Sequence, residues 1–270
     1  MSPQSRLSGC EPPESGAGML IDSHCHLNLL DHPEAALDRA RLSGIGGFLC
    51  IGVERERIGQ VLELARTHPD VWASVGQHPD VADDDLDWIE PLAAEPAVVA
   101  IGETGLDFLH AEESHARHAQ CERFDRQLEL AGRLRLPVVV HTRLAEEETA
   151  ALLARHAGVT GVLHCFTESW SLAKTALDLG YVISISGIVT FRNAENVREV
   201  ARRIPADRLL VETDCPWLAP VPFRGKPNEP SYVSATARAL AELRGEPLDQ
   251  LIENTTANFY RAFPRANSSS

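Results

Sequence analysis

A regular alternation of short apolar runs with helical patterns constrains the fold most strongly. From Met19 onward eight such runs occur, and a segment with apolar residues three and four positions apart follows each of them. The runs are "MLID", "GFLCIGV", "VWASVGQ", "AVVAIGE", "PVVVHT", "GVLHCF", "YVISISG" and "RLLVETD". Continuously apolar runs such as "PVVVHT" are typical of parallel strands buried on both faces. Eight strand–helix units in about 250 residues predict an α/β fold, a single-domain (β/α)8 TIM-type barrel.

A doubly wound open sheet is the alternative architecture. It usually has fewer strands, and no GxGxxG pattern follows the first apolar run of this chain. Helices are expected over 113–135, 169–180, 231–245 and 247–263. The predicted organisation is a disordered extension over 1–18, the barrel over 19–263 and a loose tail over 264–270, because both ends lack apolar periodicity.

Composition narrows the class of protein. The formal net charge of −14 argues against broad electrostatic attraction to nucleic acid, although bound cations can supply positive charge locally. The six cysteines form no CxxC pair, and we expect them to be reduced thiols. The chain shows no signal-peptide pattern and no apolar run of about 20 residues. We therefore expect a cytoplasmic protein with no membrane segment and no obligate protein partner.

Histidines and carboxylates follow the predicted strands at the points where the strands end. These residues are His24, His26, His78, Glu103, Asp107, His141, Arg143, His164, Glu212 and Asp214. A single histidine at a strand end is more often a structural group than a ligand, but five at strand ends are unusual. In a barrel all carboxyl ends open on one face, so these side chains should converge there. Alternation along a strand should also aim His24 and His26 the same way.

Imidazoles and carboxylates in such a cluster suit zinc and other divalent first-row ions. Four histidines and a shared carboxylate can hold two ions that activate water and stabilise a displacement at phosphorus. The other histidines are expected at the surface or in helix caps; they are His32, His68, His110, His115, His118 and His156.

Several motifs together resemble one known family over residues 19–263. They are "DSHCHL", "GQHPD", "IGETGLDF", "PVVVHTR", "GVLHCFT", "LLVETDCPWLAP" and "NTTANFYRAF". The chain resembles the TatD family of metal-dependent deoxyribonucleases, in the amidohydrolase superfamily. The resemblance implies two divalent ions, which could be zinc, manganese or magnesium.

The resemblance also implies residue roles. His24 and His26 would bind the first ion, Glu103 would bridge both ions, and His141 with His164 would complete the second site. Asp214 would bind the first ion and act as general base. The catalytic set would then be Asp214, Glu103 and His78, with His78 near the substrate phosphate or its attacking water. Contacts to phosphate at the mouth would come from Arg143, Arg224, Lys226 and Asn228.

The expected reaction is hydrolysis of DNA phosphodiester bonds at strand ends, as a 3′→5′ exonuclease acting through a metal-activated hydroxide. The partner would then be a DNA end or another nucleic-acid phosphodiester. Deacylation of mischarged aminoacyl-tRNA at the same centre is the alternative, and a non-catalytic metal-binding interaction protein is a third reading that the intact ligand set disfavours. The basic segment "FRGKPNEP" favours a phosphate-bearing substrate but does not separate DNA from tRNA. No aromatic stacking platform is evident, although Phe191, Trp217 and Phe223 lie in loops at the mouth, and core packing is at least as good an interpretation of Trp217.

Overall fold

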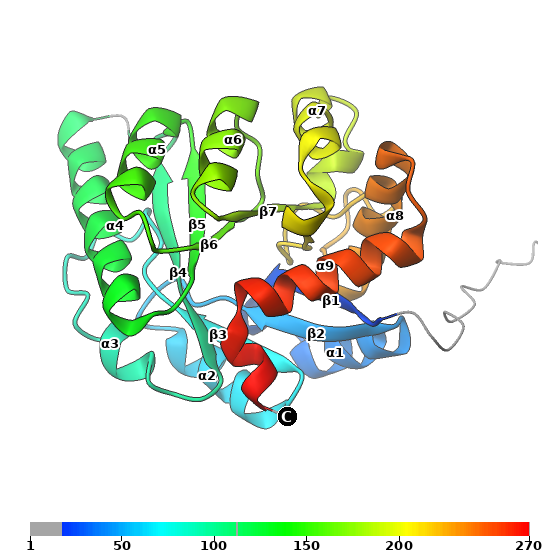
Figure 1. Cartoon of the computed structure of the whole chain (residues 1–270). Helices are drawn as coiled ribbons and strands as arrows, with labels where there is room; N and C mark the ends of the chain where they lie inside the picture. Colours follow the sequence, from blue (N-terminus) through cyan, green and yellow to red (C-terminus); the bar gives the residue numbers. More distant parts are fainter. Residues whose placement is uncertain (1–17, 112, 270) are drawn as a thin grey trace, which may run out of the picture.

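Eight parallel strands form one sheet in the order β1 to β8, in a computed structural model that describes residues 18–111 and 113–269 (Figure 1). The strands are β1 (Leu20–Cys25), β2 (Ile45–Cys50), β3 (Val71–Val75), β4 (Val98–Asp107), β5 (Val138–Arg143), β6 (Gly161–Leu163), β7 (Val182–Ile185) and β8 (Leu209–Val211). The sheet curls into a nearly closed barrel, which confirms the predicted (β/α)8 architecture. The disordered extension expected over 1–18 lies, apart from Gly18, outside the described residues.

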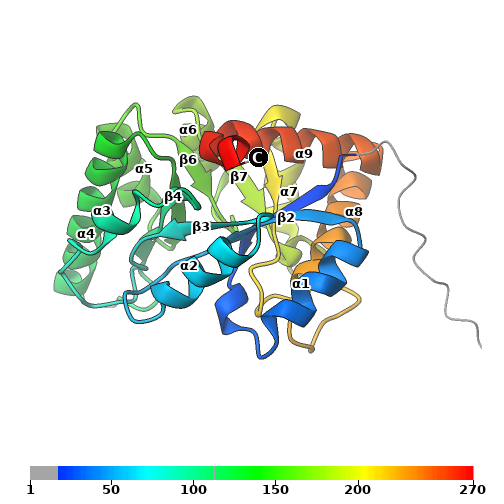
Figure 2. The ribbon, with the colours of Figure 1, turned by 90° about the horizontal axis from the view of Figure 1, so that it is seen from below.

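Helices follow the strands and surround the sheet (Figure 2). The α-helices are α1 (Pro33–Leu42), α2 (Ile58–Thr67), α3 (Ile89–Leu92), α4 (Ser114–Leu134), α5 (Glu146–Arg155), α6 (Trp170–Asp178), α7 (Glu195–Arg203), α8 (Val233–Arg244) and α9 (Leu248–Ala262). Short 3-10 helices are η1 (Leu27–Leu29), η2 (Gly187–Thr190), η3 (Ala206–Arg208), η4 (Pro230–Tyr232) and η5 (Pro264–Ser269). The four helices predicted from the sequence are all present. Within the described ranges, no helix combines the length and apolarity needed to cross a membrane.

Side-chain alternation along the strands sorts residues between the barrel interior and the helices. In β5, Val138 and Val140 belong to the core between sheet and helices, whereas Val139 belongs to the cluster inside the barrel. Val162 of β6 and Leu210 of β8 lie in the same interior cluster. Because alternate residues share a face, His141 and His164 continue the interior rows of Val139 and Val162 toward the carboxyl end. The strand pattern itself therefore aims these two imidazoles into the barrel mouth.

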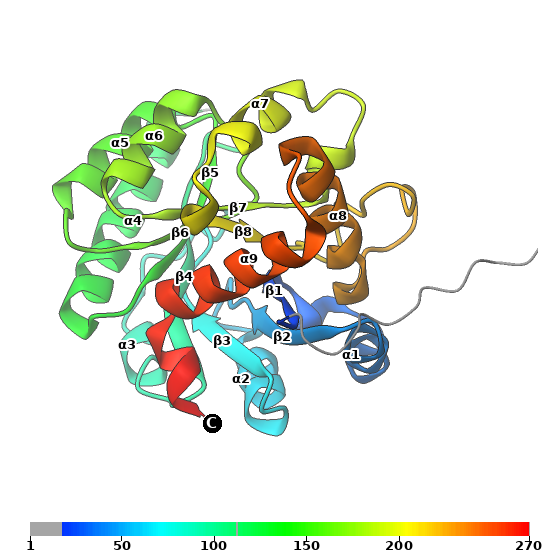
Figure 3. The ribbon, with the colours of Figure 1, turned by 45° about the vertical axis from the view of Figure 1, so that its right-hand side comes forward.

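The interior cluster is completed by the C-terminal helix. Helix α9 crosses the sheet in Figures 1 and 3, and its Phe259 is fully buried in that cluster together with Phe263. The expectation of a loose tail over 264–270 is wrong for its first residues. They form η5, where Ala266 is only 2% exposed and the Arg265 guanidinium donates to the Ala93 carbonyl oxygen. One small apolar side chain in a short polar segment was too weak a signal to predict this packing.

The barrel closes between β1 and β8, the two ends of the strand order. The Asp214 backbone N–H donates to the His24 carbonyl oxygen at 3.0 Å, and the His26 N–H donates to the Cys215 carbonyl oxygen at 2.9 Å. The buried Asp22 carboxylate accepts from the backbone N–H and the hydroxyl of Thr213, at 2.9 and 2.6 Å. Desolvation by burial raises the pKa of Asp22 to about 8. These contacts hold the first strand, with its two histidines, beside Asp214.

We expect Asp22→Ala to lower the free energy of unfolding by about 2–4 kcal/mol, because two buried donors of Thr213 lose their acceptor. Asp22→Asn keeps one oxygen and the shape, so its loss should be smaller. The raised pKa means that folded metal-free protein holds a proton which the unfolded chain has released above pH 4. The contribution of Asp22 to the free energy of unfolding of wild type therefore decreases as pH rises toward 8. The asparagine variant lacks this pH dependence.

Chemical unfolding of metal-free protein at pH 5 and pH 8 measures both effects. The free energy of unfolding of Asp22→Asn, relative to that of wild type, should be higher at pH 8 than at pH 5. The absence of this increase would contradict the assignment of a buried, proton-binding Asp22.

Candidate active site

A cavity of about 730 Å³ opens at the carboxyl ends of the strands. Most of the strand-end residues singled out in the sequence line it, and they are His26, His78, Glu103, Asp107, His141, Arg143, His164 and Asp214. His24 lies directly beneath, fully buried, and its ring stacks on that of His164 with centroids 3.8 Å apart. The predicted convergence on one mouth is confirmed.

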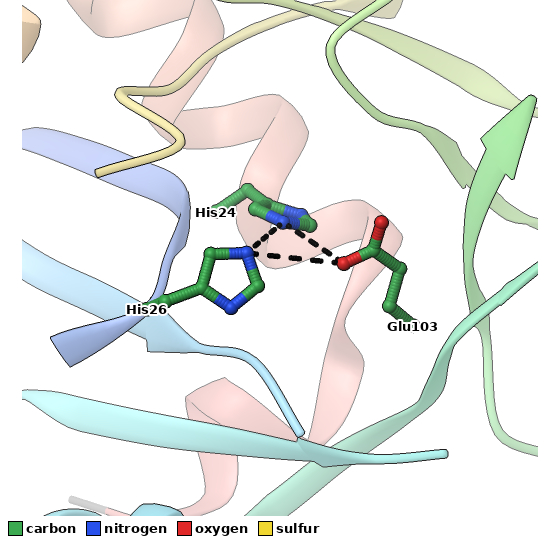
Figure 4. Close-up of side chains that lie close together, drawn as sticks. All are labelled: His24, His26 and Glu103. Atoms are coloured by element: carbon green, nitrogen blue, oxygen red, sulfur yellow. Dashed lines mark hydrogen bonds and ion pairs between the residues drawn. The ribbon is translucent and has the colours of Figure 1, made fainter. Parts of the chain in front are cut away.

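Four donor atoms on the β1 side of the cavity face one another. His24 Nε2 and His26 Nε2 are 3.3 Å apart, and both point toward Glu103 Oε2, at 3.5 and 3.9 Å (Figure 4). Asp214 Oδ1 lies 3.6 Å from His24 Nε2 and 3.4 Å from His26 Nε2. Ligand atoms of a tetrahedral ion with bonds of about 2.0–2.2 Å are separated by about 3.3–3.6 Å. The two histidines therefore lie at distances from each carboxylate oxygen, 3.4–3.9 Å, that are close to those between the ligands of one divalent ion.

A second group of donor atoms surrounds the other oxygen of Glu103. Oε1 lies 2.8 Å from His164 Nε2, 3.1 Å from His141 Nδ1 and 3.5 Å from His78 Nε2. His141 Nδ1 and His164 Nε2 are 3.3 Å apart. One buried carboxylate thus presents each of its oxygens to a different set of imidazoles.

The charges at the site fit bound cations. The Nε2 atoms of His24 and His26 face Glu103, while the Nδ1 atoms on the other side of each ring are buried without a hydrogen-bond partner among the described residues. Burial raises the pKa of Glu103, but the surrounding histidines, His164 foremost, outweigh burial and hold that pKa well below its usual range. Burial also raises the pKa of Asp214, but the hydrogen bond of His26 and the charges of the surrounding histidines outweigh burial and lower that pKa. Two ionised carboxylates converging in a buried site are stabilised by cations between them.

His78 differs from the other histidines. Its Nδ1 accepts the backbone N–H of Asp80 at 3.2 Å, so its proton resides on Nε2 in the neutral ring. Desolvation by burial, assisted by His141 and His164, lowers the pKa of His78 to about 4. At neutral pH the ring is therefore an uncharged N–H donor directed at Glu103, which fits a group that contacts substrate better than a metal ligand.

Two carboxylates that received no role in the sequence analysis lie against the ligand histidines, and one of them, Asp107, orients its histidine through a hydrogen bond. Asp107 Oδ2 accepts from His141 Nε2 at 3.2 Å, which leaves His141 Nδ1 free to face Glu103. Burial raises the pKa of Asp107, but the hydrogen bond and charge of His141 outweigh it and lower the pKa to about 2. Glu212 is fully buried with Oε1 3.4 Å from His164 Nδ1. Their strand-end positions were the available signal for such a role.

Helix α4 supplies a support that sequence reasoning missed. The Gln120 side chain accepts from the Asp107 backbone N–H at 2.9 Å and donates to the Asp107 carbonyl oxygen at 3.1 Å. Gln127 makes the same pair of bonds to the backbone of Gln77, at 2.9 and 3.0 Å. Both amides therefore fix the ends of β4 and β3 next to His78 and Asp107.

The expected phosphate contacts are only partly placed at the cavity. Arg143 lines it, but Arg224 and Lys226 are exposed outside the lining, and Arg224 covers the Phe191 ring at 3.8 Å. Asn228 is a correction: it is 1% exposed, and its Nδ2 donates to the carbonyl oxygens of Thr213 and Trp217. Its amide holds the loop after β8 and cannot reach a substrate.

Three further residues line the cavity although the sequence analysis did not assign them to it. Arg57 lines the cavity and was not predicted. His110, expected as a surface or capping group, is exposed but also lies on the cavity wall, with Nδ1 3.2 Å from Asp107. Trp217 also lines the cavity and is 51% exposed, so core packing is excluded for it.

Fold and site together define the class of protein. It is a (β/α)8 barrel with a cluster of histidines and carboxylates at the carboxyl ends of its strands. A model of the family described as TatD related DNase matches residues 21–264. The chain is 45% identical to the uncharacterized metal-dependent hydrolase YcfH of Escherichia coli over 90% of this chain and 95% of that protein. It is 39% identical to the uncharacterized metal-dependent hydrolase YabD of Bacillus subtilis, over 91% and 99%.

A solved structure agrees with these relatives. The crystal structure of the TatD homologue YjjV from Escherichia coli superimposes with a TM-score of 0.84 at 32% identity, and the match covers 92% of this chain and 98% of that one. The chain belongs to the TatD family of metal-dependent hydrolases.

We expect Asp107→Asn to weaken metal binding by about 10- to 100-fold, because it removes the acceptor that fixes the ring and tautomer of His141. Asp87→Asn is the matched control, because Asp87 is an exposed carboxylate outside the cavity lining. Titration of metal-free protein with zinc, followed by calorimetry, compares the two variants. An equal loss in both, or none in Asp107→Asn, would contradict the orienting role.

Proposed function

We propose that the protein is a nuclease that hydrolyses phosphodiester bonds at DNA ends with two divalent metal ions. The observation that carries the proposal is the division of Glu103, whose Oε2 faces His24 and His26 while Oε1 faces His141 and His164. A single ion would need only one of these sets. A carboxylate between two sets of ligands is the arrangement that holds two ions about 3.5–4 Å apart.

The first ion would be held by His24, His26, Glu103 and Asp214, and the second by Glu103, His141 and His164. An imidazole-rich donor set favours zinc over magnesium, which prefers oxygen ligands. Ions bound there would lower the pKa of a water molecule and stabilise negative charge on phosphate oxygens.

Two side chains at the cavity floor would handle the proton and the phosphate. The Asp214 carboxylate has a lowered pKa, so it is ionised at neutral pH, and part of its surface reaches the cavity. It can accept the proton of the attacking water. His78, uncharged and carrying its proton on Nε2, can donate a hydrogen bond to a phosphate oxygen without a charge of its own.

The shape and charge of the cavity support a strand end as substrate. Its volume of about 730 Å³ is in the range of small-ligand sites, which suits a terminal nucleotide and not a duplex. Arg143 and Arg57 lie on the wall and can contact neighbouring phosphates, although Arg57 is already paired with Glu54 at 2.9 Å. With a net charge of −14 the remaining surface attracts nucleic acid little, so we expect short contacts at the mouth.

Parallel incubations test the proposal. Metal-loaded protein receives end-labelled single-stranded DNA, duplex DNA and mischarged aminoacyl-tRNA, with chelator-treated protein as the control. We expect stepwise shortening of single-stranded DNA, with loss of the 3′ label first, as the 3′→5′ polarity requires. Hydrolysis of the aminoacyl ester without cleavage of DNA would overturn the proposed bond and favour the deacylase alternative.

Asp214→Asn should reduce kcat by about 10²- to 10⁴-fold at saturating metal, because the amide keeps the shape and one oxygen but accepts no proton. Asp87→Asn, an exposed carboxylate outside the cavity lining, is the matched control. The measurement is turnover of single-stranded DNA across a metal titration. Recovery of Asp214→Asn to within a few-fold of wild type in excess metal would show that Asp214 only holds an ion.

A further inference from the structure

The cavity has two chemically different walls. Strand order equals chain order, so the loops after β7, β8 and β1 are neighbours around the barrel. Along this arc the lining side chains above the metal ligands are apolar: Ile188, Trp217, Leu218 and Leu29. The arc over β2 to β5 instead contributes charged groups of both signs, namely Arg57 and Arg143 and the carboxylates of Glu54, Asp80 and Asp107. With cations held at Glu103, a ligand that fits both walls carries an anionic part for the cations and the arginines, and a flat or apolar part on the same short unit.

Trp217 is the large aromatic side chain of the apolar wall. Half of its surface is exposed, at 51%, and its ring meets His26 edge-on, with centroids 5.2 Å apart and an interplanar angle of 71°. The edge-on contact leaves an indole face open beside a predicted metal ligand. An exposed tryptophan at this place is costly in contact with water, since burial of an aromatic face is strongly favourable.

The other loop aromatics near this arc are already engaged. Phe223 stacks on Tyr232, with centroids 3.8 Å apart and planes 4° from parallel, and the Phe191 ring is covered by Arg224. Among the residues that the structure describes on the cavity lining, Trp217 is the one tryptophan, tyrosine or phenylalanine. It is therefore the surface on which a planar ligand group can stack.

We propose that Trp217 stacks on the base of the terminal nucleotide whose phosphodiester lies at Glu103, and that the site thereby selects ends that carry a base. This inference rests on the proposed nuclease function and adds a specificity-determining residue to it. A nucleotide has its anionic phosphate and planar base on one sugar, which matches the two walls. Because every base has a π-face, Trp217 should favour bases over a bare sugar without strong preference among the four bases.

Kinetics on paired substrates test the stacking. One single-stranded oligonucleotide ends in an intact nucleotide, and the other ends in a tetrahydrofuran abasic nucleotide. For wild type we expect kcat/KM to be about 5- to 150-fold higher on the intact end, mainly through KM. Trp217→Ala should lose that advantage and equal wild type on the abasic end, while Trp217→Phe should stay within about 3-fold of wild type on both substrates.

Equal losses in Trp217→Ala on intact and abasic ends would overturn the inference, since they would reflect a damaged site. Metal content of each variant checks that the contact with His26 is not the cause. If wild type cleaves neither oligonucleotide, the proposed nuclease function is wrong. The stacking is then tested separately, by the binding of the two oligonucleotides.

Binding is read from tryptophan fluorescence in the Asp214→Asn background, which blocks turnover. The other tryptophans lie away from the cavity lining: Trp72 and Trp88 are buried, and Trp170 packs under Arg203 at 4.0 Å. We expect the intact end to quench fluorescence, the abasic end to quench much less, and the difference to vanish when Trp217→Phe is added. Equal quenching by both ends would also overturn the proposal.

Discussion

The buried carboxylate of Glu103 is the feature on which the rest of the site depends. A charge in the barrel interior is tolerated only with close partners of opposite sign or with hydrogen bonds, and Glu103 has five imidazoles within 3.9 Å. Burial lowers the pKa of His164, but Glu103 and Glu212 outweigh burial and raise it well above its usual value. In metal-free protein a proton on His164 therefore partly compensates the carboxylates. Metal ions would replace that proton, so metal binding and proton release are coupled.

The barrel places chemically different groups by strand order alone. Closure between β1 and β8 brings His24 and His26 beside Asp214, which lies far from them in the chain. The neighbouring pair Asp22 and Thr213, for example, is separated by 191 residues. The same order puts an apolar arc opposite a charged one around the cavity. The order of the strands around the barrel therefore decides which side chains line each wall of the cavity.

Sequence reasoning succeeded where periodicity determines direction. His141 follows Val139 by two positions, and the interior place of Val139 in β5 carries over to the imidazole. His24 and His26 also meet as predicted, although the ladder of β1 with β2 shifts register between Asp22 and Cys25, so simple alternation is not the whole cause. Loop side chains lack such a rule. Asn228 turned inward to bond backbone oxygens and Arg224 turned onto Phe191, because tertiary contacts, absent from local pattern, decide their orientation.

Electron paramagnetic resonance of manganese-loaded protein tests most directly whether Glu103 joins two ions. Elemental analysis of wild type should give two manganese ions per chain, and the spectrum should show exchange coupling between them. Glu103→Gln, which keeps the side-chain shape but presents only one oxygen, should give uncoupled manganese and less than two ions per chain while circular dichroism stays unchanged. A single ion in wild type, or two coupled ions in Glu103→Gln, would contradict the account.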